Sequence, residues 1–186
     1  MAISAIVAVA LLAACRPAAP PSTEAAIGGP FHLVDQDGHP ADQNLLRGRW
    51  SLVYFGYTFC PDACPATLAN LANALDKLGS RAGSVQVVFI TVDPHRDNPG
   101  QLKAYLASPS FPKRIIGLTG TDAGIAAVAR AYHVYYRQAG NGAAYSVDHT
   151  SVVYLMDPDG HFSKPIGFGE PPADVARDIG NAMAGV

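Results

Sequence analysis

The sequence predicts an α/β fold in which a mixed β-sheet is flanked by helices. Three short runs rich in β-branched and aromatic residues are almost continuously apolar, which is typical of strands covered on both faces. Segments with a helical spacing of apolar residues separate these runs, and this alternation indicates a sheet with helices packed against it. The three predicted strands are Ser51–Phe55, Val85–Val92 and Thr150–Met156.

The other elements follow in chain order. Asp35-Gln36-Asp37-Gly38 predicts the turn of an N-terminal β-hairpin, and Asp157-Pro158-Asp159-Gly160 predicts a second turn near the C-terminus. One predicted helix ends at Gly79, another follows Thr121 as N-cap residue, and the last follows Pro171-Pro172. This order describes a thioredoxin-like plan with a single domain. The apolar faces of these helices carry Leu68, Leu71, Leu75 and Leu78, then Ile125, Val128, Ala129 and Tyr132, then Val175, Ile179 and Met183.

Composition excludes several classes of protein. The chain has 186 residues, of which 49% are hydrophobic and 15% charged, so it can bury the core of one domain. Its 13 lysines and arginines form no run of three and its net charge is −2, which argues against nucleic-acid binding. Three cysteines are too few for a miniature fold framed by disulfides.

The first fifteen residues predict an export signal. Residues 1–14 are almost wholly apolar and uncharged, and Leu12-Ala13-Ala14-Cys15 ends the segment with small residues at a cleavage point. These four residues resemble the lipobox of bacterial lipoproteins, in which the cysteine becomes the lipidated first residue. An ordinary signal peptide that contains a cysteine is the alternative. We expect lipidation at Cys15 and a location on the periplasmic face of a bacterial membrane.

Residues 16–30 predict a tether between the anchor and the domain. The segment consists mostly of Ala, Pro and Gly and has neither helical nor strand periodicity. Such a sequence cannot bury apolar area, and at ~3 Å per residue it reaches roughly 45 Å. The folded domain is therefore expected to span residues 31–186.

Cys60 and Cys64 fall between the first central strand and the first long helix. In an open α/β sheet, ligands bind at this junction, outside the carboxyl end of a strand. Cysteines four positions apart across a helical turn bring their side chains to ~5–6 Å, which permits a shared metal ion or a disulfide. The positive end of the helix favours the thiolate form. A purely structural disulfide is the alternative in an exported protein, but so short a loop gains little entropic stabilisation.

His149 is expected to face the cysteine pair. If Thr150–Met156 runs antiparallel to the first central strand, its beginning lies at the sheet edge where that strand ends. His149 then faces the cysteines, although 85 positions separate it from Cys64. Two thiolates and an imidazole suit copper, because sulfur holds Cu(I) and the added nitrogen accommodates Cu(II). Structural zinc normally takes four protein ligands, and the sequence offers no obvious fourth.

The motifs at these positions resemble those of the SCO/SenC family of copper chaperones. Phe59–Pro65, Asp93–Asp97 and Asp148–Thr150 occur in the family's order, followed by a strand and Asp157–Gly160. The resemblance runs from about Phe31 to the C-terminus. It implies a thioredoxin-like fold and delivery of copper to the dinuclear copper site of cytochrome c oxidase, or reduction of that site's cysteines.

By this resemblance Cys60, Cys64 and His149 are the copper ligands, and the two cysteines form the redox disulfide. The implied partners are the copper-site subunit of cytochrome c oxidase and a periplasmic thiol reductase or another copper chaperone. Asn98 stands where Thr is expected, which leaves the ligand set unchanged. The alternative function is that of a thioredoxin-like thiol–disulfide oxidoreductase to which copper is incidental, since the same dithiol serves both.

The segment Asp93–Asp97 follows the second central strand and opens on the same sheet edge as Cys60. One interpretation is local structure, with Asp97 or Asn98 as a helix N-cap and Arg96 paired with an aspartate. The other, which the resemblance implies, is a polar rim at Asp93 and Asp97 that docks the copper recipient. Both interpretations remain open at this point.

Overall fold

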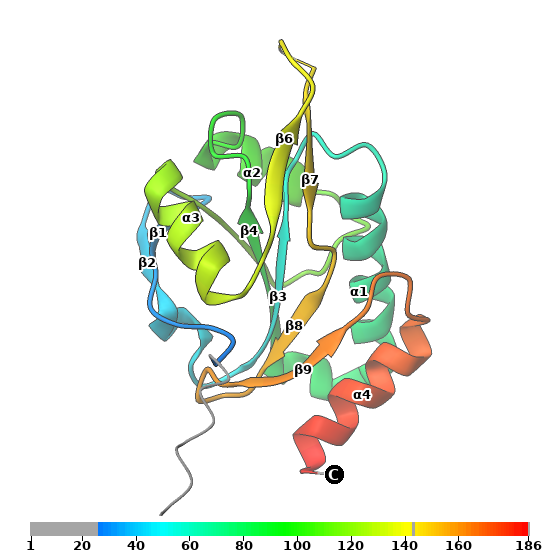
Figure 1. The fold of residues 1–186 in the computed structure, drawn as a ribbon. Coiled ribbons are helices and arrows are strands. Elements are labelled where there is room, and N and C mark those ends of the chain that lie inside the picture. Colours follow the sequence, from blue (N-terminus) through cyan, green and yellow to red (C-terminus); the bar gives the residue numbers. More distant parts are fainter. Residues whose placement is uncertain (1–25, 143, 186) are drawn as a thin grey trace, which may run out of the picture.

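A seven-stranded mixed sheet forms the centre of the computed structural model, which describes residues 26–142 and 144–185 (Figure 1). The strand order is β2-β1-β5-β4-β3-β8-β9. β3, β4 and β5 run parallel to one another, whereas β1 and β8 are antiparallel to their neighbours β5 and β3. The strands are β1 (His32–Asp35), β2 (Pro40–Asp42), β3 (Trp50–Gly56), β4 (Val85–Thr91), β5 (Ile115–Thr119), β8 (Val153–Met156) and β9 (Phe162–Ile166).

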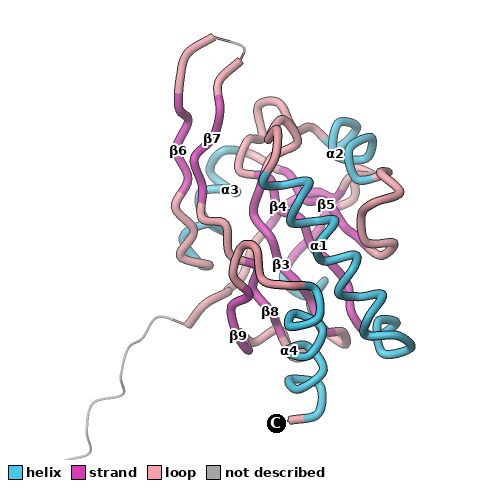
Figure 2. Tube along the Cα trace, turned by 90° about the vertical axis from the view of Figure 1, so that its right-hand side faces the viewer, coloured by secondary structure: helices cyan, strands magenta, loops and turns pink. Residues whose placement is uncertain are grey.

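Helices cover both faces of this sheet. α1 and α4 lie side by side on one face, and α3 lies on the opposite face (Figures 1 and 2). Thr121 caps α3 as predicted, because its hydroxyl accepts a hydrogen bond from the Gly124 amide. The helices are α1 (Ala63–Leu78), α2 (Pro99–Leu106), α3 (Asp122–Ala131) and α4 (Pro172–Ala184), with 3₁₀ turns η1 (Gln43–Leu46) and η2 (Gly79–Ser84).

The central strands are buried on both faces, as their continuous apolar character predicts. Alternation along β3 sends Tyr54 toward α1 and Phe55 toward α3. The Tyr54 hydroxyl lies 3.7 Å from the Cys64 sulfur, whereas the Phe55 ring packs 5.3 Å from that of Tyr132, centroid to centroid. The predicted α/β class and the N-terminal hairpin formed by β1 and β2 are confirmed.

Two strand predictions need correction. β8 begins at Val153 rather than Thr150, and Ser146–His149 instead forms β7, which pairs with β6 (Tyr136–Ala139) in a separate two-stranded sheet. This β6–β7 hairpin projects beyond the main sheet (Figure 1). The prediction also left out β5, whose pattern Gly117 interrupts. A Cβ at Gly117 would lie 2.5 Å from a Leu106 methyl carbon, so the glycine lets α2 approach the strand.

Residues just before Phe31, the predicted start of the domain, also contact the core. The Gly28 amide donates to the Ala131 carbonyl at 2.8 Å, and Ile27 is partly buried against the core. One backbone hydrogen bond and one apolar side chain leave no periodic signal in the sequence. The predicted signal segment, Cys15 and residues 16–25 of the tether lie outside the described residues. In the part of the chain that the structure describes, no helix has the length and hydrophobicity to span a membrane.

The sheet topology brings three segments to one edge. β3 and β4 are parallel, and their last residues Gly56 and Thr91 are paired, so the loops after both strands leave the sheet together. β8 is antiparallel to β3 with Val153 opposite Tyr54, so the residues that precede β8 reach this edge too. The loop between β3 and α1 (residues 57–62, called the cysteine loop), the 92–98 loop and the end of β7 therefore meet at this edge.

Candidate metal centre

The cysteine loop leads from β3 into the first turn of α1. The Cys60 amide donates to the Tyr57 carbonyl at 3.2 Å, and the Cys60 sulfur accepts a hydrogen bond from the Cys64 amide at 3.4 Å. Asp62 occupies the N-cap position without a side-chain capping bond, so the Cys60 sulfur satisfies a helix amide that a capping side chain would usually take. Cys64 is fully buried, Cys60 is partly exposed, and both are free thiols.

His149 lies where the topological argument predicts, at the end of β7 and against the cysteines. Its Nε2 is 3.6 Å from the Cys64 sulfur, and its Nδ1 is 3.0 Å from the Thr150 carbonyl oxygen. A carbonyl only accepts, so Nδ1 carries the proton in the neutral ring and Nε2 presents its lone pair to the sulfur. The imidazole is thus prepared to act as a ligand through Nε2.

The thiols of Cys60 and Cys64 differ in pKa. A hydrogen bond from the Cys64 side chain, the backbone amides of Cys64 and Asp62 and the nearby His149 lower the pKa of Cys60 to about 5, against the opposing effect of partial burial. The pKa of Cys64 is raised, because its proton is held by the Cys60 sulfur and its side chain is buried. In the metal-free protein Cys60 is therefore the thiolate at neutral pH, and Cys64 retains the proton.

Asp93 and Asp97 do not form a surface rim. Asp93 is 3% exposed and Asp97 is fully buried, so neither carboxylate faces a docking partner. The Asp97 carboxylate accepts hydrogen bonds from the Thr58 amide and from the Thr58 and Thr91 hydroxyls, at 2.9, 2.6 and 2.6 Å. Burial raises the pKa of Asp97, and these hydrogen bonds act against that rise. Asp97 therefore ties the cysteine loop to the end of β4.

The local-structure interpretation of this segment is confirmed. Asn98 caps α2 by accepting from the Gln101 amide at 3.0 Å, and Arg96 pairs with Asp93. The sequence reasoning missed Tyr145, whose hydroxyl donates to Asp93 at 2.6 Å. Its only signal was an aromatic residue four positions before His149, which a strand places on the same face.

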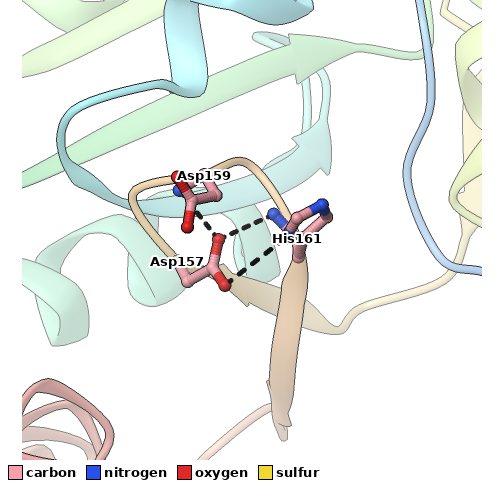
Figure 3. A group of neighbouring side chains, drawn as sticks. All are labelled: Asp157, Asp159 and His161. Carbon is pink, nitrogen blue, oxygen red and sulfur yellow. Dashed lines mark hydrogen bonds and ion pairs between the residues drawn. The ribbon is translucent and has the colours of Figure 1, made fainter.

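A second group with metal-binding residue types lies in the turn between β8 and β9. Carboxylate and imidazole atoms of Asp157, Asp159 and His161 lie within 4.8 Å of one another (Figure 3). Hydrogen bonds internal to the turn account for this arrangement. Asp157 Oδ1 accepts from the Asp159 and His161 amides at 2.9 and 2.8 Å, and Gly160 adopts φ 83°.

The turn between β1 and β2 has the same pattern of side-chain to backbone hydrogen bonds. Asp35-Gln36-Asp37-Gly38-His39 has the same Asp-x-Asp-Gly-His pattern, and Asp35 Oδ1 accepts from the Asp37 and His39 amides at 2.8 and 2.9 Å. Two distant hairpins thus use one side-chain arrangement to close a turn. The residues at 157–161 are explained as a turn and not as a metal site.

A family model described as SCO1/SenC matches residues 19–184. The chain belongs to the SCO1/SenC family. It is 45% identical over 150 residues to the mitochondrial Protein SCO1 homolog 1 of Arabidopsis thaliana, an alignment that covers 80% of this chain and 44% of the relative. This chain spans about half the length of the first curated relatives that it matches, with 44% and 48% covered.

Solved Sco structures have the same fold, which confirms the thioredoxin-like plan. Bradyrhizobium japonicum ScoI with copper bound is 41% identical at a TM-score of 0.76, covering 84% of this chain and 99% of that one. A SCO1/SenC family lipoprotein of Bacillus anthracis is 26% identical at 0.73, covering 89% and 99%. BsSco, described as a Sco family cytochrome c oxidase assembly protein with a disulfide switch, is 27% identical at 0.67, covering 88% and 94%.

Proposed function

We propose that this protein binds copper through Cys60, Cys64 and His149 and supplies it to the dinuclear copper site of cytochrome c oxidase. The observation that carries the proposal is the approach of His149 Nε2 to within 3.6 Å of the Cys64 sulfur, although 85 positions separate the two residues. A solved relative that is 41% identical over nearly its full length has copper bound.

The chemistry of the three side chains fits copper. Two soft sulfurs suit Cu(I), and an imidazole nitrogen suits Cu(II), so the set can retain the ion in both oxidation states. Cys60 is deprotonated before metal arrives, because the pKa of its thiol is lowered to about 5. Copper replaces the proton that Cys64 keeps in the metal-free protein, so binding releases a proton. The hydrogen bond from Nδ1 to the Thr150 carbonyl holds the imidazole in the required tautomer.

The proposed setting is the periplasmic face of a bacterial membrane, with Cys15 lipidated. Leu12–Cys15 has the lipobox pattern, and the alanine- and proline-rich residues that follow give the domain reach from the membrane. A copper site embedded in the same membrane is then accessible to the tethered domain. Another copper chaperone loads the domain, or a periplasmic thiol reductase keeps its cysteines reduced.

Copper stoichiometry tests the assignment. The reduced full chain should bind one Cu(I), and Cys60→Ser or Cys64→Ser should abolish tight binding, because a single thiolate loses the two-sulfur clamp. Cys15→Ser is the matched control, since it makes the same exchange outside the proposed site. Stoichiometric Cu(I) binding by the Cys60→Ser/Cys64→Ser double variant would refute the copper assignment.

A second candidate function is thiol–disulfide exchange, favoured by the reactive form of Cys60. In this reaction the Cys60 thiolate attacks a disulfide of the recipient. Cys64 then attacks the Cys60 sulfur of the resulting mixed disulfide and displaces the recipient's second thiolate, so that a Cys60–Cys64 disulfide forms here and two thiols are released in the recipient. His149→Ala separates the two candidates. Copper binding predicts a far larger loss of Cu(II) than of Cu(I) affinity, whereas a pure reductase predicts unchanged Cu(II) binding and slower reduction of a model disulfide.

A further inference from the structure

Arg96 lies between the cysteine loop and the hairpin that carries His149. Its guanidinium carbon is 3.6 Å from the centre of the Tyr145 ring and 4.7 Å from that of Phe59. Phe59 immediately precedes Cys60, and Tyr145 immediately precedes β7. The guanidinium Nη1 also donates to the Tyr145 carbonyl at 2.9 Å. One side chain thus contacts both segments that supply the proposed copper ligands.

The strand geometry connects this contact to His149. Successive side chains of a strand alternate between faces, so Val147 and His149 point the same way. Tyr145, two positions before Val147, is half-buried like His149 and continues this alternation. Burial follows that alternation, since Val147 is buried while Ser146 and Asp148 are exposed. Fixing Tyr145 against the body of the domain therefore determines which face of β7 turns toward the cysteines. The hairpin otherwise projects beyond the main sheet (Figure 2).

Asp93 fixes the orientation of Arg96. Its carboxylate accepts from Arg96 Nε through Oδ2 and from the Tyr145 hydroxyl through Oδ1, at 2.5 and 2.6 Å. The Asp93 amide in turn donates to the Thr91 hydroxyl at 2.9 Å, which anchors the group to the end of β4. Arg96 is only about one-seventh exposed in its side chain, so these contacts form in a largely desolvated setting.

We propose that Arg96, oriented by Asp93, is a positioning residue that holds the β6–β7 hairpin against the cysteine loop and so places His149 at the copper. This inference rests on the proposed function and names the residue on which the nitrogen ligand depends. Arg96 acts through Phe59, which is beside Cys60, and through Tyr145, which immediately precedes the strand of His149.

The arrangement requires a guanidinium. Arg96 stacks a flat cation on an aromatic ring while donating in its plane to a carboxylate and a carbonyl, which an ammonium group cannot do at once. Arg96→Lys should therefore behave like Arg96→Met. Loss of a group that orients a ligand typically weakens metal binding about 10–100-fold. We expect a loss of this size for Cu(II), whose binding uses the imidazole, and little change for Cu(I), which two thiolates retain.

The experiment compares Arg96→Met, Arg96→Lys and Tyr145→Phe in the full chain. Cu(II) is added to each, and imidazole nitrogen coupling is read by electron paramagnetic resonance alongside both copper affinities. Tyr145→Phe keeps the ring and removes only the hydroxyl bonded to Asp93, so it serves if the Arg96 variants fail to fold. Arg137→Met is the matched control, because Arg137 lies on the same hairpin with an exposed side chain paired to Asp148. The Arg96 variants should lose or weaken the coupling, and the control should retain it.

Amide hydrogen exchange in the metal-free protein provides an independent measurement. Arg96→Met should speed exchange in β6 and β7 while leaving β3 and β4 protected. Unchanged exchange in the hairpin together with unchanged nitrogen coupling would overturn the role of Arg96. Equal losses of Cu(I) and Cu(II) affinity, with exchange raised throughout the domain, would also overturn it in favour of general destabilisation. If the wild-type protein shows no nitrogen coupling, the proposed ligand set fails, and exchange alone decides whether Arg96 holds the hairpin.

Discussion

Gly56 is the last residue of β3 and packs against the buried Cys64. A Cβ built at this position would lie 2.9 Å from the Cys64 sulfur and 2.8 Å from a ring carbon of Phe89, closer than real Cβ atoms approach. The absence of a side chain therefore lets the first turn of α1 pack on the end of the strand. This close approach of Gly56 and α1 allows Cys64 to be fully buried.

Gly56→Ala should destabilise the fold by about 1–3 kcal/mol, because the added methyl overpacks the site, and should weaken Cu(I) binding by displacing Cys64. Urea denaturation and Cu(I) competition measure the two effects. Gly83→Ala is the matched control, since a Cβ there would meet nothing within 4 Å and its φ is not positive. Equal stability of the Gly56 and Gly83 variants would contradict this account of the packing.

The lowered pKa of Cys60 predicts the pH dependence of alkylation in the metal-free, reduced protein. An acid whose pKa is lowered to about 5 is already a thiolate above that pH. The alkylation rate should therefore stay nearly level between pH 8 and 6, and fall with acidification through about pH 5. Stopped-flow alkylation followed by peptide mapping gives the rate and the site. A rate that climbs through pH 7–8, as for an ordinary thiol near pKa 8.5, would show that Cys60 is not activated.

At the scale of the element, the two Asp-x-Asp-Gly-His turns predict a purely structural effect. Asp35→Ala and Asp157→Ala should each cost about 1–3 kcal/mol, because each removes an oxygen that accepts two backbone amides. Asp157→Asn should restore much of the stability, since the amide oxygen still accepts. Thermal unfolding measures the loss. If Asp157→Ala lowered the copper stoichiometry while Asp35→Ala did not, the turn explanation of residues 157–161 would be wrong.

Elements with a strong local pattern could be predicted from the sequence. For α3, the spacing of Ile125, Val128 and Ala129 indicates the buried face, and Thr121 indicates the N-cap. The helix therefore starts where the sequence predicts. β7 was harder, because only Val147 is buried within it and a strand that short has almost no periodicity. Its pairing with β6 depends on contacts between two strands of only four residues each, which local propensity does not encode.

Part of the candidate site could likewise be predicted from the sequence, and part could not. Cys60, Cys64 and His149 could be proposed together because strand direction brings their segments to one edge, and the structure places Cys64 and His149 in contact. A surface rim at Asp93 and Asp97 was one of the two interpretations left open, and the family resemblance implied it. Arg96, three positions from Asp93, could be predicted as a partner, but the burial of the two carboxylates also depends on Thr58 and Tyr145, which come from other segments. No spacing in the sequence indicates these long-range hydrogen bonds.

The proposed lipid anchor and the copper-binding domain should be separable. Cys15→Ser should release the protein from membranes or block its maturation, while copper binding by the purified chain remains unchanged. Membrane fractionation and metal analysis of one preparation measure both. Cys60→Ser is the reciprocal control, since it should stay membrane-bound and lose copper. Wild-type protein found wholly in the soluble periplasmic fraction would refute the lipid anchor.

We propose that one copper ion is bound jointly by Cys60, Cys64 and His149. X-ray absorption at the copper edge of the protein loaded with one equivalent tests it most directly, because sulfur and imidazole scatterers are distinguished in the first coordination shell. Joint binding should give two sulfurs and one imidazole nitrogen for Cu(II), with the nitrogen lost in His149→Ala and one sulfur lost in Cys64→Ser. A shell of oxygen and nitrogen alone, or a spectrum unchanged in both variants, would contradict it.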